Sequence, residues 1–224
     1  MKVLTAAASA KITADWQRQF PGLGEYRPLH LLRRVGPLLE GIVLERTSGN
    51  DIYRPTFHVH CLAGVFPAVT MTLAHELRSE SSGGPDFVSV LHHESQHVEA
   101  AARLCRQSPL ALKGNLTLED VLDAYCGYLQ RAGTHYDANF LYGDMARVCG
   151  WSGQVERANA IIAEGVRAME QWPARIVDQM GGVEQWRRDV SGVVANQCQL
   201  RDIADAQARL LGAHALPVAD LVAT

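Results

Sequence analysis

The alternation of apolar and polar positions predicts strands in the first half of the chain. Residues 41–64 have apolar, β-branched arms around a Thr-Ser-Gly-Asn-Asp segment, which predicts a β-hairpin because such residues favour a turn. Residues 66–77 alternate with a period of two, which predicts another strand, although Pro67 would also fit the first turn of a helix. Residues 16–41 indicate a helix, a turn rich in Pro and Gly, and a short amphipathic segment.

Helical spacing dominates the second half. Thr117 and Asp120 have the spacing of a capping box, which predicts a helix from there to about residue 131. Apolar residues then recur every three or four positions, as on the buried face of a helix. Glycines punctuate the ends of these segments. The further predicted helices span about 139–149, 155–171, 183–197 and 199–211.

Together these patterns predict an α+β fold. Its N-terminal half would contain a small antiparallel sheet with helices, and its C-terminal half would be all helical. The expected division is between residues 1–112 and 113–216. Because the connection between the two regions is short, we expect them to pack as one compact unit.

Bulk composition narrows the classes of function. The 224 residues are 47% hydrophobic and 20% charged, which is ordinary for a globular protein. A formal net charge of -3 and a pI near 6.3 give no basic surface for nucleic acid or for an anionic membrane. The N-terminal residues lack the apolar run of a signal peptide, and no segment has the ~20 apolar residues of a membrane span. We therefore expect a cytoplasmic protein.

Cysteine usage and short motifs exclude several familiar chemistries. The five cysteines are odd in number and form no C-x-x-C pair, so neither a disulfide framework nor a thiolate zinc ribbon is expected. The chain also contains no G-x-S-x-G nucleophile elbow, no P-loop and no G-x-G-x-x-G after a strand.

One motif does carry chemistry, the H-E-x-x-H spelling of residues 93–97. On a helix, His93 and His97 lie on one face and can bind one zinc ion, while Glu94 serves as general base on the zinc-bound water. The helical pattern is clear from about residue 94 to 106. Whether residues 87–92 begin this helix or form a strand stays open, and a strand there could take His93 off the helix.

A helical wheel places the motif at the edge of an apolar face. His93 and His97 fall on a flank of that face, and Glu94 falls inside the apolar arc, where loss of solvent would raise its pKa. The face itself, which is expected to be buried, is centred on Phe87, Leu91, Val98, Ala101 and Cys105.

The zinc hypothesis lacks an obvious third protein ligand. Glu119 is a candidate on the following helix, but acids in a first helical turn usually act as caps. His58 and His60 lie two apart on the same side of a predicted strand, with their neighbours toward the core, and would have to converge with the motif. We therefore favour no catalytic residue, metal ligand or cofactor. Zn²⁺ is expected only if the chain is a zinc-dependent hydrolase.

The simpler interpretation of the motif is structural. It is a helix with His92 on its surface, two flanking histidines, and a Glu94 paired with an arginine such as Arg54 or Arg78.

A resemblance points to a different class of function. Residues 31–62 contain an L-x-R-x-G segment (Leu32, Arg34, Gly36) and a return strand with Y-x-P-x-F (Tyr53, Pro55, Phe57). Residues 143–158 add an A-x-x-x-G-W helix end. This pattern, over about a third of the chain, resembles small bacterial immunity proteins of polymorphic toxin systems. The resemblance implies a non-enzymatic inhibitor that binds a cognate toxin domain and blocks its active site, and it carries over no partner-binding residues.

Two hypotheses follow from the sequence. The first is a non-enzymatic binding protein whose partner is a protein, such as a toxin domain, with no role for nucleic acid or membrane. The alternative is a zinc-dependent hydrolase that uses Glu94 as base, with His93 and His97 and either Glu119 or the pair His58 and His60 as ligands.

Overall fold

The fold is that of a computed structural model, which describes residues 4–49, 51–131 and 138–223. The chain divides into two units. A sheet unit contains residues 1–60, 70–116 and 212–220, and a helical unit contains 61–69, 117–211 and 221–224. The expected division was a single one, at 112 and 113, whereas the chain passes between the units after residues 60, 69, 116, 211 and 220. Within the described ranges, no helix has both the length and the apolarity to cross a bilayer.

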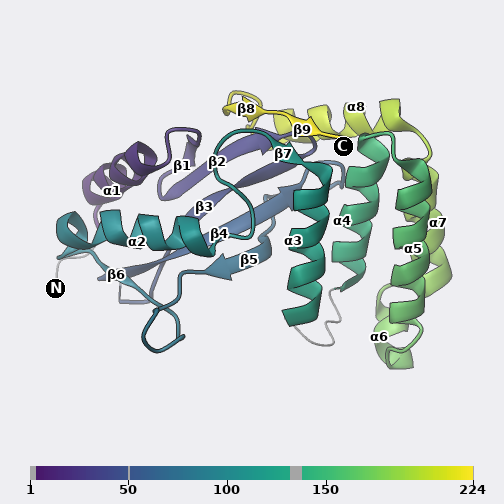
Figure 1. The fold of residues 1–224 in the computed structure, drawn as a ribbon, viewed down its shortest axis with the longest axis horizontal. Coiled ribbons are helices and arrows are strands. Elements are labelled where there is room, and N and C mark those ends of the chain that lie inside the picture. The colour runs from purple at the N-terminus through teal and green to yellow at the C-terminus, as the bar shows by residue number, and fades with distance from the viewer. Residues whose placement is uncertain (1–3, 50, 132–137, 224) are drawn as a thin grey trace. The chain divides into compact units, whose positions relative to one another are not determined.

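The sheet unit is built on a mainly antiparallel sheet, as the sequence predicted (Figure 1). Its central strands follow the order β1-β2-β3-β4-β5, β6 pairs with β4, and β8 runs parallel to β2. The strands are β1 (Gly24–Arg27), β2 (His30–Val35), β3 (Leu38–Arg46), β4 (Ile52–Cys61), β5 (Thr72–Glu76), β6 (Val88–Ser89) and β8 (Val218–Ala219).

The predicted hairpin is present as β3 and β4, which are neighbours in the sheet. The strand predicted over 66–77 covers only 72–76, and its register against β4 shifts between Phe57 and Val59. Leu73, at this irregularity, has φ +53°, which marks a bulge where the register shifts before pairing resumes at Val59 and Thr72.

The region after the first helix was not recognised as strands. It forms β1, β2 and the start of β3. Because β2 buries residues on both of its faces, its sequence lacks the alternation of apolar and polar positions that would predict a strand. Arg33 on β2 is 3% exposed and faces Glu40 of β3, with Arg33 Nε donating to the Glu40 carboxylate at 2.6 Å. The same guanidinium donates to the carbonyl oxygens of Ala111 and Gly114, which ties that loop to the sheet.

Two helices lie side by side over one face of the sheet, α1 (Ala6–Gln19) and α2 (His93–Gln107) (Figure 1). The side chain of Thr5 caps α1 by accepting from the amide of Ala8. Ile12 and Trp16 then project into the core, where Trp16 is fully buried.

The helical unit contains six helices within the described residues, and four of them match the predicted helices after residue 139. A short helix after Pro173 was not predicted, and α7 ends three residues earlier than expected. The helices are α3 (Leu118–Arg131), α4 (Ala138–Trp151), α5 (Val155–Met169), α6 (Ala174–Gln179), α7 (Val183–Val194) and α8 (Gln197–Leu210). Two short strands, β7 (Leu116–Thr117) and β9 (Leu221–Val222), pair with each other.

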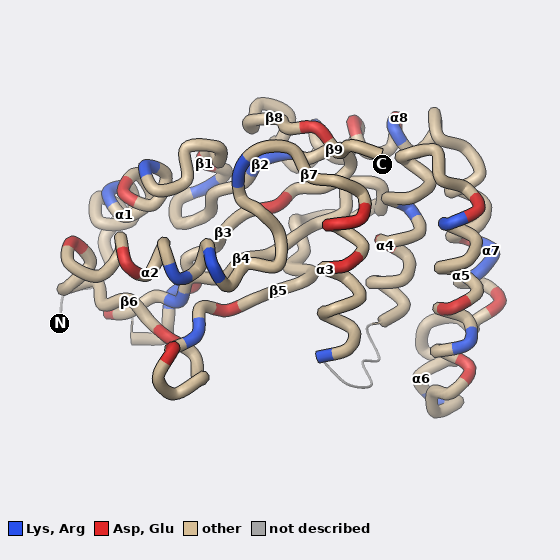
Figure 2. Tube along the Cα trace, viewed as in Figure 1, with Lys and Arg blue, Asp and Glu red and all other residues tan. Residues whose placement is uncertain are grey.

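The predicted capping box at the start of α3 is confirmed. The amide of Thr117 donates to the Asp120 carboxylate at 2.9 Å, and the amide of Asp120 donates to the Thr117 hydroxyl at 3.1 Å. Further along, α4 and α5 approach closely at Gly165, where a Cβ atom would lie 3.0 Å from the Cβ of Tyr142. Charged residues of both signs are distributed along the described parts of both units, without a long run of one sign (Figure 2).

Candidate functional site

The helix that carries the H-E-x-x-H motif begins at His93. Residues 88 and 89 form the short strand β6, and His92 is the last residue before the helix. Of the two possibilities for residues 87–92, the strand is therefore present at residues 88 and 89, the helix includes none of them, and His93 is its first residue.

The orientation of α2 reverses the one predicted from the helical wheel. Val98 of α2 is 51% exposed and Leu91, just before the helix, is 67% exposed, while His93, His97 and Leu104 are buried. Ala101 lies on the buried face as predicted, but Cys105 is exposed. The prediction of a buried apolar face was wrong because the histidines find hydrogen-bond partners in the core that the sequence did not reveal.

Those partners form a buried chain of hydrogen bonds from α1 through β4 to α2. The indole N–H of Trp16 donates to the Tyr53 hydroxyl at 2.9 Å, and that hydroxyl lies 2.7 Å from Nδ1 of His93. Nε2 of His93 lies 2.9 Å from a carboxylate oxygen of Asp15. Because a carboxylate only accepts, His93 carries its proton on Nε2 and accepts from Tyr53 on Nδ1. The ring is thus held in a single tautomer.

Asp15 is the charged end of this chain. Its burial would raise the pKa of the carboxyl group, but hydrogen bonds from Lys11 and His93 outweigh burial and hold the pKa at about 2. Arg18 also pairs with the same carboxylate. For His93, burial lowers the pKa, while the hydrogen bond to Asp15 opposes that change. The pair therefore consists of an ionised Asp15 and a neutral His93 near neutral pH.

The remaining members of the motif do not complete a zinc site. Glu94 was expected within the apolar arc, but its side chain is 82% exposed and pairs with Lys11 at 3.2 Å, so neither Arg54 nor Arg78 is its partner. His97 stacks on His93 with ring centroids 4.5 Å apart, and its Nδ1 lies 2.9 Å from the His93 carbonyl oxygen.

A catalytic zinc ion does not fit these residues as they are arranged. A zinc ligand must present a free nitrogen lone pair, whereas both ring nitrogens of His93 are already engaged. Across residues 4–49, 51–131 and 138–223, no three His, Cys, Asp or Glu side chains are grouped so that they could hold a metal ion. Glu119, the proposed third ligand, belongs to the helical unit and binds Arg157 through both of its carboxylate oxygens.

The other predicted pair, His58 and His60, lies on β4 as expected for a strand, but both histidines are fully buried as well as their neighbours. Nε2 of His58 lies 2.7 Å from Nε2 of His30, and Nδ1 of His60 lies 2.8 Å from the Thr70 hydroxyl. Burial lowers the pKa values of all three histidines, to about 3 for His58 and about 4 for His30 and His60.

These histidines predict a loss of stability in mild acid. An unfolded histidine takes up a proton near pH 6.5, whereas the folded state resists protonation until about pH 4. Lowering the pH through this window therefore favours the unfolded chain, and we expect each histidine to lower the free energy of unfolding by on the order of one to three kcal/mol. Chemical denaturation at several pH values measures it.

The variant His30→Gln separates the effect of the buried histidines from that of two buried carboxyl groups, which oppose it. Burial raises the pKa values of Glu40 and Asp144 to about 7, so these groups bind a proton more readily in the folded chain than in the unfolded chain. They therefore stabilise the folded state as the pH falls from 7 toward 4. In His30→Gln one titrating histidine is absent, and its stability should fall less steeply between pH 6.5 and 4 than that of the wild type. Equal slopes would show that His30 does not titrate differently in the folded and unfolded states.

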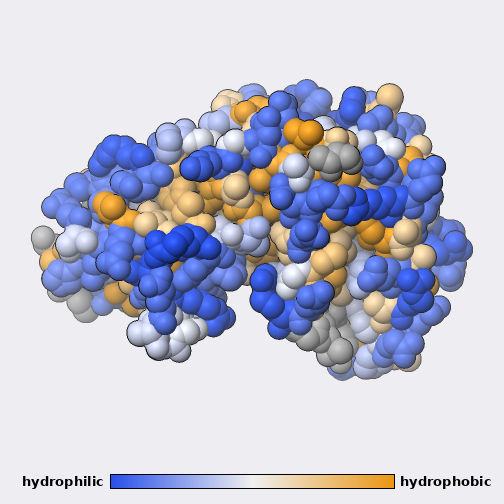
Figure 3. Space-filling view, viewed as in Figure 1, coloured by the Kyte–Doolittle hydropathy of each residue, from blue (hydrophilic) through white to orange (hydrophobic). Residues whose placement is uncertain are grey.

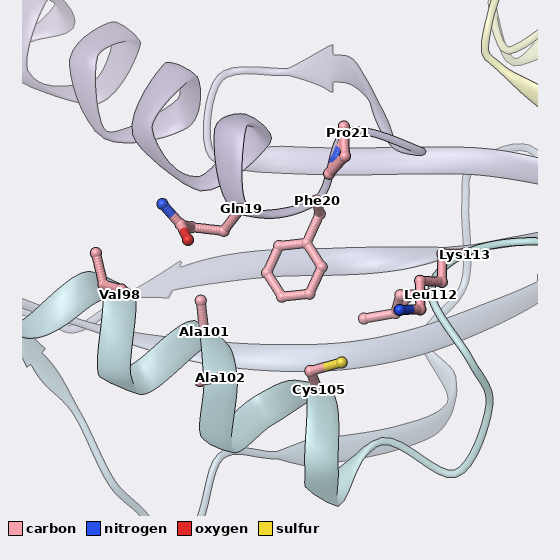
Figure 4. A pocket seen from close by; sticks show the side chains of 9 residues that line it. All are labelled: Gln19, Phe20, Pro21, Val98, Ala101, Ala102, Cys105, Leu112 and Lys113. Atoms are coloured by element: carbon pink, nitrogen blue, oxygen red, sulfur yellow. The ribbon is translucent and has the colours of Figure 1, made fainter.

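A cavity of about 310 Å³ opens between the end of α1 and the outward side of α2. Phe20 points between α2 and Leu112, and the Cys105 sulfur lies near the same end (Figure 4). Apolar residues gather between α1 and α2 in the space-filling view (Figure 3). The lining is mainly apolar and consists of Gln19, Phe20, Pro21, Val98, Ala101, Ala102, Cys105, Leu112 and Lys113. We refer to these nine residues as the α1–α2 groove.

Acidic residues on α2 are neutralised within the chain. Glu94 pairs with Lys11, and Glu99 pairs with Arg103 at 2.7 Å. Lys113, by contrast, lies in the α1–α2 groove and has no ion-pair partner within the described part of the chain. The groove therefore combines an apolar floor with one positive charge at its edge.

Comparisons with protein-family models, curated proteins and solved structures return no match for this chain. The sequence located α2 but missed Asp15, Trp16 and Tyr53. Their only signal was that Asp15 shares a helical face with Ile12 and Trp16, where a lone carboxylate indicates a buried partner.

Proposed function

We propose that this chain is a non-enzymatic protein-binding protein of the immunity type, which recognises a toxin domain with the α1–α2 groove. The observation that carries the proposal is the reversed orientation of α2. Its histidines are buried, while Val98 and Cys105, which line the α1–α2 groove, are exposed. Burying an apolar side chain of this size stabilises a protein by about 1.5–3 kcal/mol, and the isolated chain lacks that stabilisation. Val98 lines the mainly apolar α1–α2 groove, and exposed apolar surface of this kind is typical of an interaction site.

The chemistry of the groove limits the partner. An apolar side chain would enter between Phe20 and Leu112, in the manner of an interface anchor. A carboxylate beside that anchor would meet Lys113, since the acids of α2 already have cationic partners. The occupant we propose is therefore a surface segment of the toxin domain with an apolar anchor flanked by an acid.

A substitution at the centre of the outward face tests this proposal. The chain would be co-expressed with the toxin domain encoded beside it in its source genome, and the complex would be measured by size-exclusion chromatography and titration calorimetry. Val98→Glu is expected to weaken an equimolar complex by about 100-fold, as loss of an interface anchor does.

Leu210→Glu is the matched control, because Leu210 is 69% exposed on α8 of the helical unit. It should leave the affinity unchanged. The proposal fails if no complex forms, or if both substitutions affect the complex equally.

A further inference from the structure

A second cavity, of about 330 Å³, lies at the turn between β1 and β2 and is independent of the α1–α2 groove. It is bounded by Ser9 of α1, by Arg27 and His30 at the two ends of the turn, and by Glu45 and Arg46 at the end of β3. A hydroxyl and two guanidinium groups thus border one space, while Nε2 of His30 is already engaged with His58. These are the donors that bind oxyanions in proteins.

Among the described residues that line this cavity, Glu45 is the one acid, and it already has partners. Its carboxylate accepts from Arg54 Nη2 at 2.8 Å and from the Thr56 hydroxyl at 3.0 Å. Its charge is therefore largely compensated from the β4 side. Arg27 and Arg46 leave the cavity with an excess of positive charge that an anionic ligand would balance.

One of the two guanidinium groups is held in place before any ligand binds. Arg27 lies over the ring of Tyr26, 4.8 Å from its centroid, and also donates to the Tyr26 hydroxyl at 3.2 Å. The Tyr26 ring in turn meets the His30 ring edge-on, with centroids 5.2 Å apart. Fixing a long side chain in advance reduces the entropy lost on binding.

The turn that forms the cavity is strained. Leu29 follows Pro28 and has φ +66°, a conformation that a branched side chain adopts at a cost of about 1 kcal/mol or more. It is held there because its amide donates to the Thr13 hydroxyl at 2.8 Å and its carbonyl accepts from the amide of Leu44. Strain that the surroundings enforce in this way concentrates at binding sites.

We propose that this cavity binds a phosphate group, as carried by a small phosphorylated molecule. A phosphate presents oxygens in several directions, so it can meet Arg27 from β1, Arg46 from β3 and the Ser9 hydroxyl together, whereas a carboxylate presents two oxygens in one plane. The cavity also has room beyond the anion, because sites for small organic ligands begin at about 300 Å³.

Binding of inorganic phosphate, phenyl phosphate and acetate to the full-length chain tests the proposal. Titration calorimetry should detect phosphate and phenyl phosphate with dissociation constants of about 1 mM or below, and acetate at least about tenfold more weakly. Tighter binding of phenyl phosphate than of phosphate would identify an organic phosphate as the ligand, and equal binding would identify the free anion. Both outcomes support a phosphate site.

Substitutions tie the binding to this cavity. Arg27→Gln and Arg46→Gln should each weaken phosphate binding about tenfold, and the double variant should abolish it. Arg175→Gln, on α6 of the helical unit, is the matched control and should bind as the wild type does. Thermal unfolding of each variant verifies that it folds. Absence of phosphate binding, acetate binding of equal strength, or a double variant that binds normally would overturn the proposal.

Discussion

His93→Ala is expected to lower the free energy of unfolding by about 3 kcal/mol, because it leaves one buried hydroxyl without its acceptor and removes a donor from a buried carboxylate. The Tyr53 hydroxyl would lose its acceptor, and the Asp15 carboxylate would lose one of its three donors. Both side chains are almost fully buried, so water cannot replace the lost bonds. Urea denaturation of the purified variant measures the change.

Three further substitutions assign this loss to the hydrogen-bonded chain. Glu94→Gln should change stability by less than about 0.5 kcal/mol, because its ion pair with Lys11 is exposed. Tyr53→Phe removes one link, and we expect a cost of about 1–2 kcal/mol. In a double-mutant cycle, Tyr53→Phe and Asp15→Asn should couple by more than about 0.5 kcal/mol through His93. Strictly additive effects would contradict a connected chain.

Gly41→Ala is expected to destabilise the protein by at least about 3 kcal/mol. Gly41 pairs with Leu32 in the β2–β3 ladder, and a Cβ atom there would overlap the carbonyl oxygen of Leu31. It would also lie 2.9 Å from the Cα atom of Leu32. These atoms belong to the backbone of the central sheet, so relief requires the two strands to separate rather than a side chain to rotate. Thermal and chemical unfolding both report the loss.

Gly192→Ala is the control for Gly41→Ala, and we expect it to stabilise the protein instead of destabilising it. Gly192 lies within α7, and a Cβ atom added there would meet no described atom within 4 Å outside its own helical neighbourhood. Alanine should therefore stabilise this helix by about 0.5–1 kcal/mol. Similar effects of the two substitutions would refute the close strand approach at Gly41.

Local signals predicted much of the fold. The capping box of Thr117 and Asp120 is visible in the sequence because its partners are three residues apart. The hairpin of β3 and β4 was likewise predicted from its turn residues and β-branched arms. The strand β2 escaped recognition, since its buried Arg33 resembles a surface residue until Glu40 is known to face it.

The candidate site depends on contacts between distant segments. Asp15 and His93 are 78 residues apart in the chain, so their hydrogen bond leaves no periodic signal. Without that bond, burying His93 and His97 would be unfavourable, and the helical wheel reasonably placed Leu91 and Val98 inward. The reversed helix is therefore the feature that sequence periodicity could not supply, and the proposed partner surface rests on it.

The nitrogen NMR signals of the His93 ring, recorded before and after equimolar zinc is added, test the structural role of the motif most directly. We expect one tautomer, with the proton on Nε2 and Nδ1 as acceptor, and no change when zinc is added. A ring that shows the other tautomer, or whose signals shift on stoichiometric zinc binding together with those of His97, would contradict the buried chain and restore the metal site.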